Sequence, residues 1–192
     1  LLAVAFFIAA MAHPVLKQDG AKLGQAPMVI FVDNGWQAAE NWSTIKERLQ
    51  LILAQAQADG TKVLVQGTAD TFTADRLAFK PANKALENLP TLAPRPWPSK
   101  AAKVAKTVAN AAEKRTNTQP IWLSAGVMPP KKRDAFIAQA ESLGRTRVFL
   151  PPRADLPLSI ETADARQGGF NVQLHRPASG GVRDVSVSLR DM

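Results

Sequence analysis

The sequence predicts an α/β protein built on a doubly wound, mostly parallel sheet. Short apolar, β-branched runs alternate with segments whose apolar residues recur at three- and four-residue steps, a pattern of strands followed by helices. Gly and Pro residues separate these segments. Hydrophobic residues make up 46% and charged residues 21% of the 192 residues, as in ordinary globular proteins. We therefore expect one packed domain, with about forty residues left for appendages.

The domain is expected to begin with a buried strand at residues 28–33 (MVIFVD), which ends in a carboxylate. An amphipathic helix follows, with apolar residues spaced from Trp42 to Ala56, and it ends at Asp59-Gly60. Residues 62–66 (KVLVQ) give the second strand. This first half therefore has the order strand, helix, strand.

The second half continues the alternation. A helix over residues 99–115 has an apolar face from Ala101 to Ala112 and a candidate N-cap at Ser99. A strand at residues 119–124 (QPIWLS) comes next. The last helix starts at Pro129-Pro130 and closes at Gly144, before a strand at residues 147–150 (RVFL). Residues 28–152 are thus predicted to form the α/β domain.

Both ends of the chain carry further predicted segments. The run from Leu1 to Ala12 is wholly apolar but shorter than the roughly 20 residues that span a bilayer. It indicates the C-terminal part of a transmembrane helix, residues 1–16, or the apolar part of a signal peptide cleaved near Ala10-Met11-Ala12. Residues 17–27 are polar and contain Gly, as expected for a tether.

The C-terminal residues 153–192 predict a β-hairpin or the start of a further β domain. Apolar and polar residues alternate around Phe170, Val172 and Leu174, and again from Val182 to Leu189. Residues 177–181 (PASGG) separate the two stretches and suit a turn.

Function is expected where the strands of the sheet end. In open parallel sheets, ligands bind beyond the carboxyl ends of the strands, at the switch in strand order. Three loops reach that edge: residues 33–37, 66–69 and 124–127. Gly35 is a candidate for a positive φ, and Trp36 is a candidate partner-binding anchor. The predicted partner-binding residues are Asp33, Asn34, Gly35, Trp36, Thr68 and Ser124.

No catalytic residue, cofactor or complete metal site is predicted. The chain has no cysteine and only two histidines, in no ligand-like or triad-like spacing. Neither Gly-rich phosphate motif occurs, and Ser124 has no nucleophile elbow around it. Asp33 is the only candidate metal ligand, and one carboxylate is too few for Mg²⁺.

The net charge of +8 fits an acidic partner, an anionic lipid surface or nucleic acid. The basic residues cluster at 100–115 and at 131–133, in segments that indicate ordinary solvated helix faces. Aromatic residues do not interleave with the first cluster, so no nucleic-acid partner is expected.

Two stretches resemble known families. Residues 1–16 (LLAVAFFIAAMAHPVL) are similar to the second membrane helix of BatA-type, or aerotolerance-regulator, anchors. Residues 28–150 resemble a von Willebrand factor A domain, with VIFVDNGW at the first strand and IWLSAGV at the fourth. The family's metal-ion-dependent adhesion site has D-x-S-x-S after the first strand, a loop Thr, and Ser-Asp-Gly after the fourth. This chain keeps Asp33 but has Gly35, Gln37 and Ala125 at the other positions, and only Thr91 could supply the loop Thr.

The resemblance implies a noncatalytic, membrane-anchored interaction module with a lost metal site. Such anchors imply a bacterial inner-membrane protein with a periplasmic domain, whose partner is a protein of the cell envelope. The alternative is a small-ligand-binding or hydrolytic α/β enzyme that uses the same crevice.

Overall fold

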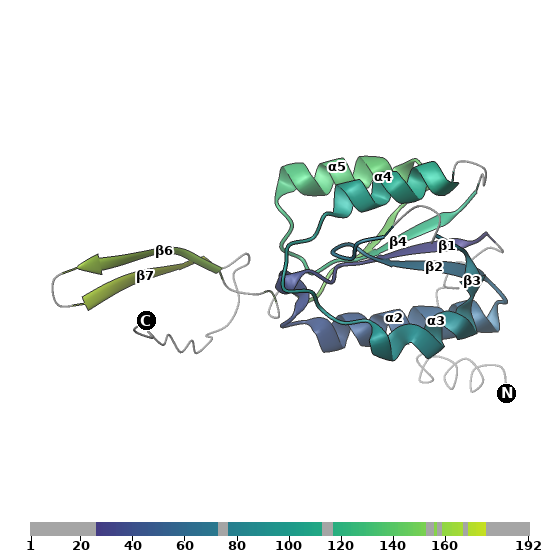
Figure 1. The fold of residues 1–192 in the computed structure, drawn as a ribbon, viewed down its shortest axis with the longest axis horizontal. Coiled ribbons are helices and arrows are strands. Elements are labelled where there is room, and N and C mark those ends of the chain that lie inside the picture. The colour runs from purple at the N-terminus through teal and green to yellow at the C-terminus, as the bar shows by residue number, and fades with distance from the viewer. Residues whose placement is uncertain are drawn as a thin grey trace, which may run out of the picture.

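The computed structural model describes residues 26–72, 77–112, 117–152, 156, 159–166 and 169–175. Its centre is a five-stranded sheet in the order β3-β2-β1-β4-β5, flanked by helices on both faces (Figure 1). All neighbours are parallel except β3, which runs antiparallel to β2. The predicted α/β class is confirmed, and the mixed sheet is consistent with a Rossmann-like fold. The strands are β1 (Met28–Val32), β2 (Lys62–Gly67), β3 (Lys80–Pro81), β4 (Gln119–Leu123) and β5 (Arg147–Phe149).

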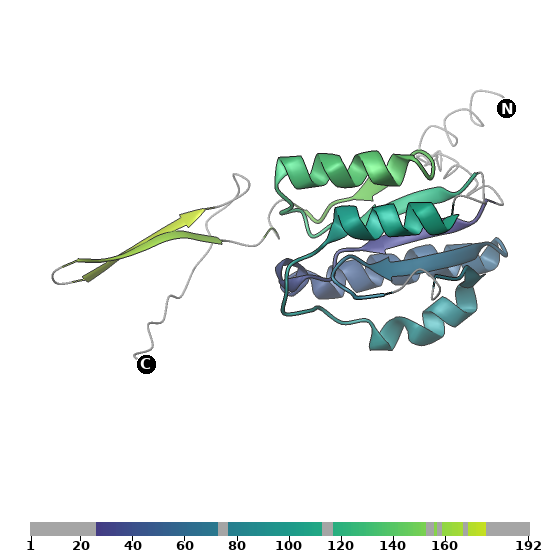
Figure 2. The ribbon, with the colours of Figure 1, turned by 45° about the horizontal axis from the view of Figure 1, so that its top comes forward.

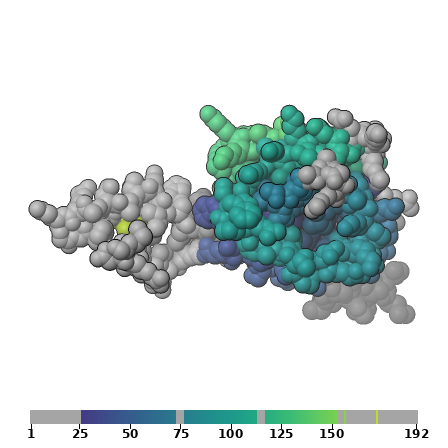
Figure 3. All heavy atoms as spheres, viewed as in Figure 1, coloured from purple at the N-terminus to yellow at the C-terminus, as the bar shows by residue number. Residues whose placement is uncertain are grey.

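Four α-helices cover the sheet in two layers. The views of Figures 1 and 2 place α2 (Trp42–Ala58) and α3 (Ala82–Asn88) on one face, and α4 (Ala101–Ala112) and α5 (Pro130–Glu141) on the other. In the space-filling view, α5 and α4 form the upper layer of the domain (Figure 3). Among the described connections, η1 (Trp36–Ala38) and η3 (Leu89–Thr91) are short 3-10 helices.

The central strand β1 supplies both cores. Met28, Ile30 and Val32 pack in the cluster that contains α2, whereas Val29 and Phe31 pack in the cluster that contains α4 and α5. All five are fully buried, and each contributes about 1.5–3 kcal/mol through removal of apolar surface from water. Because side chains alternate along a strand, Asp33 follows Phe31 onto the face of α4 and α5.

Aromatic side chains pack together on the sheet face that Asp33 shares with α4 and α5. Phe136 of α5 meets Phe31 edge-on, with ring centroids 5.3 Å apart. Its ring also contacts Trp122 of β4 at 4.6 Å. These contacts hold α5 against β1 and β4, so the start of α5 lies over the end of the sheet.

The sequence analysis did not predict β3, α3 and η3, which lie between β2 and α4. Lys80–Pro81 form the short antiparallel strand β3, and Ala82–Asn88 form α3 directly after it. Seven residues give fewer than two full turns, too few for a helical apolar period to stand out. Pro81 at the N-cap position and Pro90 in η3 limit its length.

The described C-terminal residues form a two-stranded antiparallel sheet within residues 159–175. Residues 169–175 do form a strand, β7, but it pairs antiparallel with β6 (Ser159–Arg166) on its N-terminal side. Only two residues, Gln167 and Gly168, separate the strands, a length typical of hairpin connections. We had assigned no strand to residues 159–166, because the polar residues of SIETADAR obscure the alternation. The partner predicted for residues 169–175, residues 182–189, lies outside the described residues, so that pairing stays a prediction.

No helix within the described ranges is both long and apolar enough to span a bilayer. The predicted membrane segment, residues 1–16, lies outside those ranges, as does nearly all of the predicted tether, residues 17–27.

Candidate partner-binding crevice

The three loops predicted to carry the site do meet at one edge of the sheet. Main-chain hydrogen bonds extend the strand ladder by one residue, from Thr68 N to Val32 O at 2.9 Å and from Asp33 N to Leu123 O at 2.9 Å. On the far side, Ser124 N donates to Phe149 O at 3.0 Å. The ends of β2, β1, β4 and β5 are therefore joined side by side.

Asp33 lies in the middle of this edge, with 4% of its surface exposed. Its Oδ1 accepts a hydrogen bond from Thr68 Oγ1 at 2.9 Å. Its Oδ2 accepts one from the main-chain N–H of Ala125 at 3.0 Å and a longer one from Ser124 Oγ at 3.3 Å. Both carboxylate oxygens are thus bound by groups of the protein itself.

The environment of Asp33 changes its acidity. Burial disfavours the charged form and raises the pKa of this carboxyl above its ordinary value, and the hydrogen bonds from Ala125, Thr68 and Ser124 oppose that rise. The nearby indole of Trp122 also lowers the pKa, although its Nε1 makes no hydrogen bond of good geometry. Burial is the largest effect, so the net direction is upward.

Asn34 joins the loops through its side chain and main chain. Its Oδ1 accepts from the N–H of Ala69 at 2.8 Å, and its Nδ2 donates to Ala93 O at 3.4 Å. Its carbonyl oxygen accepts from Arg95 N at 2.6 Å. Asn34 is fully buried and therefore holds the segment after η3 against the end of β1.

Gly35 was a candidate for a positive φ, and this prediction is wrong. Its φ is −72° and its ψ is 175°, an extended conformation open to any residue. The need for glycine is spatial, because a Cβ here would lie 2.9 Å from Ser99 N and 3.2 Å from Trp97 O. Trp36 N donates to Trp97 O at 3.2 Å across the same contact.

Ser99 is not the N-cap of α4, contrary to the sequence prediction. The helix begins at Ala101, and its first hydrogen bond runs from Val104 N to Lys100 O at 3.0 Å. The Ser99 hydroxyl is buried without a hydrogen-bond partner. The chain is held instead by Lys100 N, which donates to Thr68 O at 2.8 Å, and by Trp97 Nε1, which donates to Ala69 O at 2.6 Å.

A crevice of about 820 Å³ opens above Asp33, between the first turns of α4 and α5. One side is formed by η1 with Trp36, and the other by the loop from Ala125 to Pro130. Most of its wall is apolar, including Pro98, Ala101, Ala102, Val127 and Met128. Among the described residues, Asp33 is the only acidic one that lines it.

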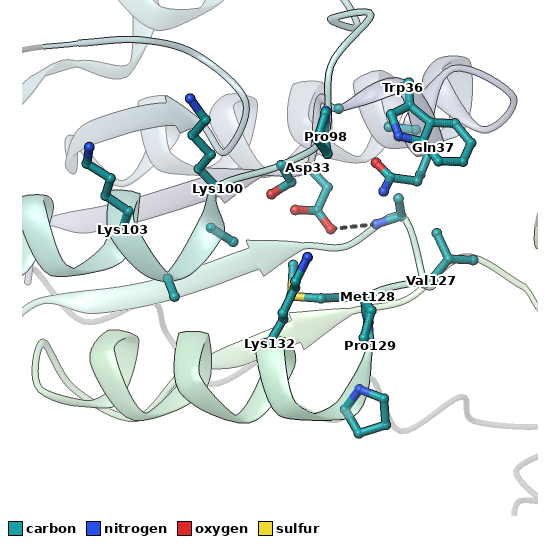
Figure 4. Close-up of a pocket in the computed structure, with 18 residues that line it drawn as sticks. Asp33, Trp36, Gln37, Pro98, Lys100, Lys103, Val127, Met128, Pro129 and Lys132 are labelled. Carbon is teal, nitrogen blue, oxygen red and sulfur yellow. Dashed lines mark hydrogen bonds between the residues drawn. The ribbon is translucent and has the colours of Figure 1, made fainter.

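Three lysines surround this crevice. Lys100 directly precedes α4, Lys103 lies in its first turn, and Lys132 lies in the first turn of α5. Figure 4 shows Lys132 below Asp33, and Lys100 and Lys103 to its left. None of the three forms an ion pair with another described residue.

The predicted site residues divide by exposure. Asp33, Asn34, Thr68 and Ser124 are buried, and we call these four the crevice floor, although only Asp33 lines the crevice itself. Gly35 is buried as well, whereas Trp36 is 53% exposed. We call Trp36, Lys100, Lys103 and Lys132 the crevice rim. Of the six predicted residues, only Trp36 presents a large surface to a protein partner.

The residues near Asp33 do not fit a metal ion of the adhesion-site type. Gly35 and Ala125 offer no side-chain oxygen, and Thr91 is exposed on η3, where its hydroxyl donates to Asn88 O at 2.7 Å. Within the described part of the chain, no three His, Asp or Glu side chains gather at one point. Thr68 is the threonine that contacts Asp33, and it does so as a hydrogen-bond donor.

Sequence reasoning missed the three lysines of the rim, which we had assigned to solvated helix faces. One feature of the sequence could have identified these lysines: they lie at the starts of helices that follow the site loops. Lys103 and Lys132 lie in first turns, where the partial positive charge of the helix end favours acidic residues. A basic residue there is electrostatically unfavourable unless an anion is near.

Comparisons with models of known protein families and with curated proteins find no match to this sequence.

Proposed function

We propose that this chain is a noncatalytic protein-interaction module whose crevice, at the carboxyl edge of the sheet, contacts a protein partner. The observation that carries the proposal is the state of Asp33, whose two oxygens are both bound by Thr68, Ser124 and Ala125. A carboxylate used in this way supports the floor and is poorly placed to act on a substrate. The exposed Trp36 beside an apolar wall is the kind of residue that anchors protein contacts.

We further propose that the domain is von Willebrand factor A-like with a lost metal site. In support, the main-chain N–H of Ala125 donates to Asp33 at the position where the family carries an Asp. In the same proposal, residues 1–16 anchor the chain in the bacterial inner membrane, and the domain lies in the periplasm with a cell-envelope protein as partner.

The test is site-specific photo-crosslinking in cells that produce the chain. A photoreactive amino acid at position 36 is compared with one at position 51, since Leu51 is a similarly exposed apolar residue on α2. We expect one protein to crosslink through position 36 and not through position 51, and Trp36→Ala to abolish its co-purification. Equal crosslinking at both positions, or co-purification that survives Trp36→Ala, refutes the proposal.

A second candidate function is small-ligand binding in the same crevice. A cavity of about 820 Å³ is within the 300–1,000 Å³ typical of ligand pockets. Hydrolysis through Ser124 has less support, because Ser124 is buried beneath the crevice and does not line it. A rise in melting temperature with one member of a metabolite panel, lost in Met128→Trp, is the result that favours this candidate.

A further inference from the structure

The crevice joins two kinds of surface that one ligand must satisfy together. Its wall is mainly apolar, with Val127, Met128 and Pro98 among the lining residues. Its cations are Lys100, Lys103 and Lys132, from two different helices. A ligand that fills it must therefore present apolar groups and negative charge side by side.

Within the described part of the chain, no acidic side chain pairs with the lysines of the crevice. Lys103 and Lys132 lie in the first turns of α4 and α5, and neither first turn contains an acidic residue. Both helix ends add partial positive charge. Elsewhere in the described residues, Arg95 pairs with Asp70 at 2.6 Å and Lys84 pairs with Glu87 at 2.9 Å. The rim lysines have no such partner.

Asp33 is the one negative side chain among the described residues that line the crevice, and it forms no ion pair with the lysines. Its carboxylate is buried and directs both oxygens to Thr68, Ser124 and Ala125. No oxygen of Asp33 comes within ion-pair distance of Lys132. An anion at the mouth of the crevice would therefore meet the lysines before it met the carboxylate.

On these grounds we infer that the occupant of the crevice is an acidic segment of a protein partner, with an Asp or Glu side chain among the rim lysines and a neighbouring apolar side chain against Val127 and Met128. This inference rests on the proposed function and specifies its partner. Inorganic phosphate would satisfy the lysines and leave most of the 820 Å³ and the apolar wall empty. Nucleic acid draws its affinity from many phosphate contacts, and three lysines in a concave, apolar site provide few.

The experiment uses the 192-residue chain and displayed random heptapeptides as the probe. We expect selected peptides to contain Asp or Glu at least threefold more often than Asn or Gln, next to an apolar residue. The strongest peptide and its Asn or Gln counterpart are then titrated. The acidic form should bind at least tenfold more tightly, and its affinity should fall as salt is raised from 0.05 to 0.5 M.

Matched lysine variants locate the effect. Lys100→Gln, Lys103→Gln and Lys132→Gln, combined, should remove the tenfold preference for the acidic peptide. Lys106→Gln with Lys131→Gln, on the same two helices but outside the crevice lining, should retain it. Thermal unfolding of both variants shows whether either one has simply failed to fold.

The outcomes separate this inference from the proposed function. If the selected peptides are neutral but need Trp36, the inference is wrong and the interaction proposal stands. If no selected peptide depends on Trp36 or on the rim lysines, both are wrong. Competition by inorganic phosphate with no preference between the acidic and neutral peptides also overturns the inference, because it identifies a simple anion site.

Discussion

The floor and the rim of the crevice lie next to each other and differ in how their polar groups are used. Floor residues are buried and bonded to each other or to neighbouring main chain, as Asp33 is to Thr68 and Ser124. Rim residues are exposed, and the rim lysines have no ion-pair partner among the described residues. The difference indicates that the floor maintains the shape of the site, whereas the rim is available for recognition.

The sharpest test of this division is Asp33→Ala. The change leaves the hydroxyls of Thr68 and Ser124 and the N–H of Ala125 without their acceptor in a buried place. Unsatisfied buried groups cost about 1–3 kcal/mol each, and relief of the buried charge offsets part of this, so we expect a net loss of about 2–4 kcal/mol. Urea unfolding gives the value, with the exposed Asp134→Ala as a control that should stay within about 0.5 kcal/mol. An unchanged midpoint for Asp33→Ala would contradict the role assigned to the floor.

Asn34→Ala should have a somewhat smaller effect. It removes the acceptor for Ala69 N and the longer bond to Ala93 O, but leaves the main-chain bond from Arg95 N. We expect a loss of about 1–3 kcal/mol in the free energy of unfolding. Asn110→Ala, at an exposed position of α4, is the matched control and should cause no loss. Equal stability of the two variants would show that Asn34 does not hold the loops together.

A smaller effect is expected from Asp33→Asn, and it should depend on pH. An amide can still accept from Ala125 and Ser124 and can donate to the Thr68 hydroxyl, so the floor is retained. Because burial raises the pKa of Asp33 in the folded state, wild-type stability should fall as pH rises from about 3.8 through the folded pKa.

The measurement is the difference in unfolding free energy between Asp33→Asn and wild type from pH 3 to 8. From about pH 3.8 to the folded pKa of Asp33, the free energy of unfolding of Asp33→Asn should rise relative to that of wild type. Above the folded pKa, the difference between the two should be constant. If Asp33→Asn instead loses stability relative to wild type as pH rises, hydrogen bonding outweighs burial, and the pKa of Asp33 is lowered in the folded state.

The smallest expected effect belongs to the rim. Lys132→Gln removes an exposed charge that has no ion-pair partner, so the free energy of unfolding should change by less than about 0.5 kcal/mol. Relief of positive charge in the first turn of α5 would make any change slightly favourable. Calorimetry on this variant and on Lys131→Gln provides the comparison. A loss above 1 kcal/mol for Lys132→Gln alone would assign this lysine to the structure of the site.

Sequence reasoning could place the floor because the floor follows from local rules. A buried strand that ends in Asp33, and another that ends at Ser124, must bring both residues to one edge of a parallel sheet. The rim depends on how α4 and α5 pack and on the segment before α4, which crosses over Gly35. The spacing of apolar residues in the sequence does not show how α4 and α5 pack. The three rim lysines were therefore interpreted as part of solvated helix faces. Gly35 and Ser99 were misjudged for the same reason, since long-range contacts define their surroundings.

The position of β1 at the centre of the sheet sets the order in which the floor can form. Thr68, which bonds Asp33 from the β2 side, comes 35 residues later in the chain, and Ser124, on the β4 side, comes 91 residues later. At about 5–20 residues per second, synthesis of those 91 residues takes roughly 5–20 seconds. β1 can pair with β2 only after the first 35 of those residues, and its other hydrogen-bonding edge stays open until β4 is made, which is a hazard for pairing with other chains. Completion of the crevice floor is therefore a late event in the biogenesis of this domain, and it coincides with closure of that edge by β4.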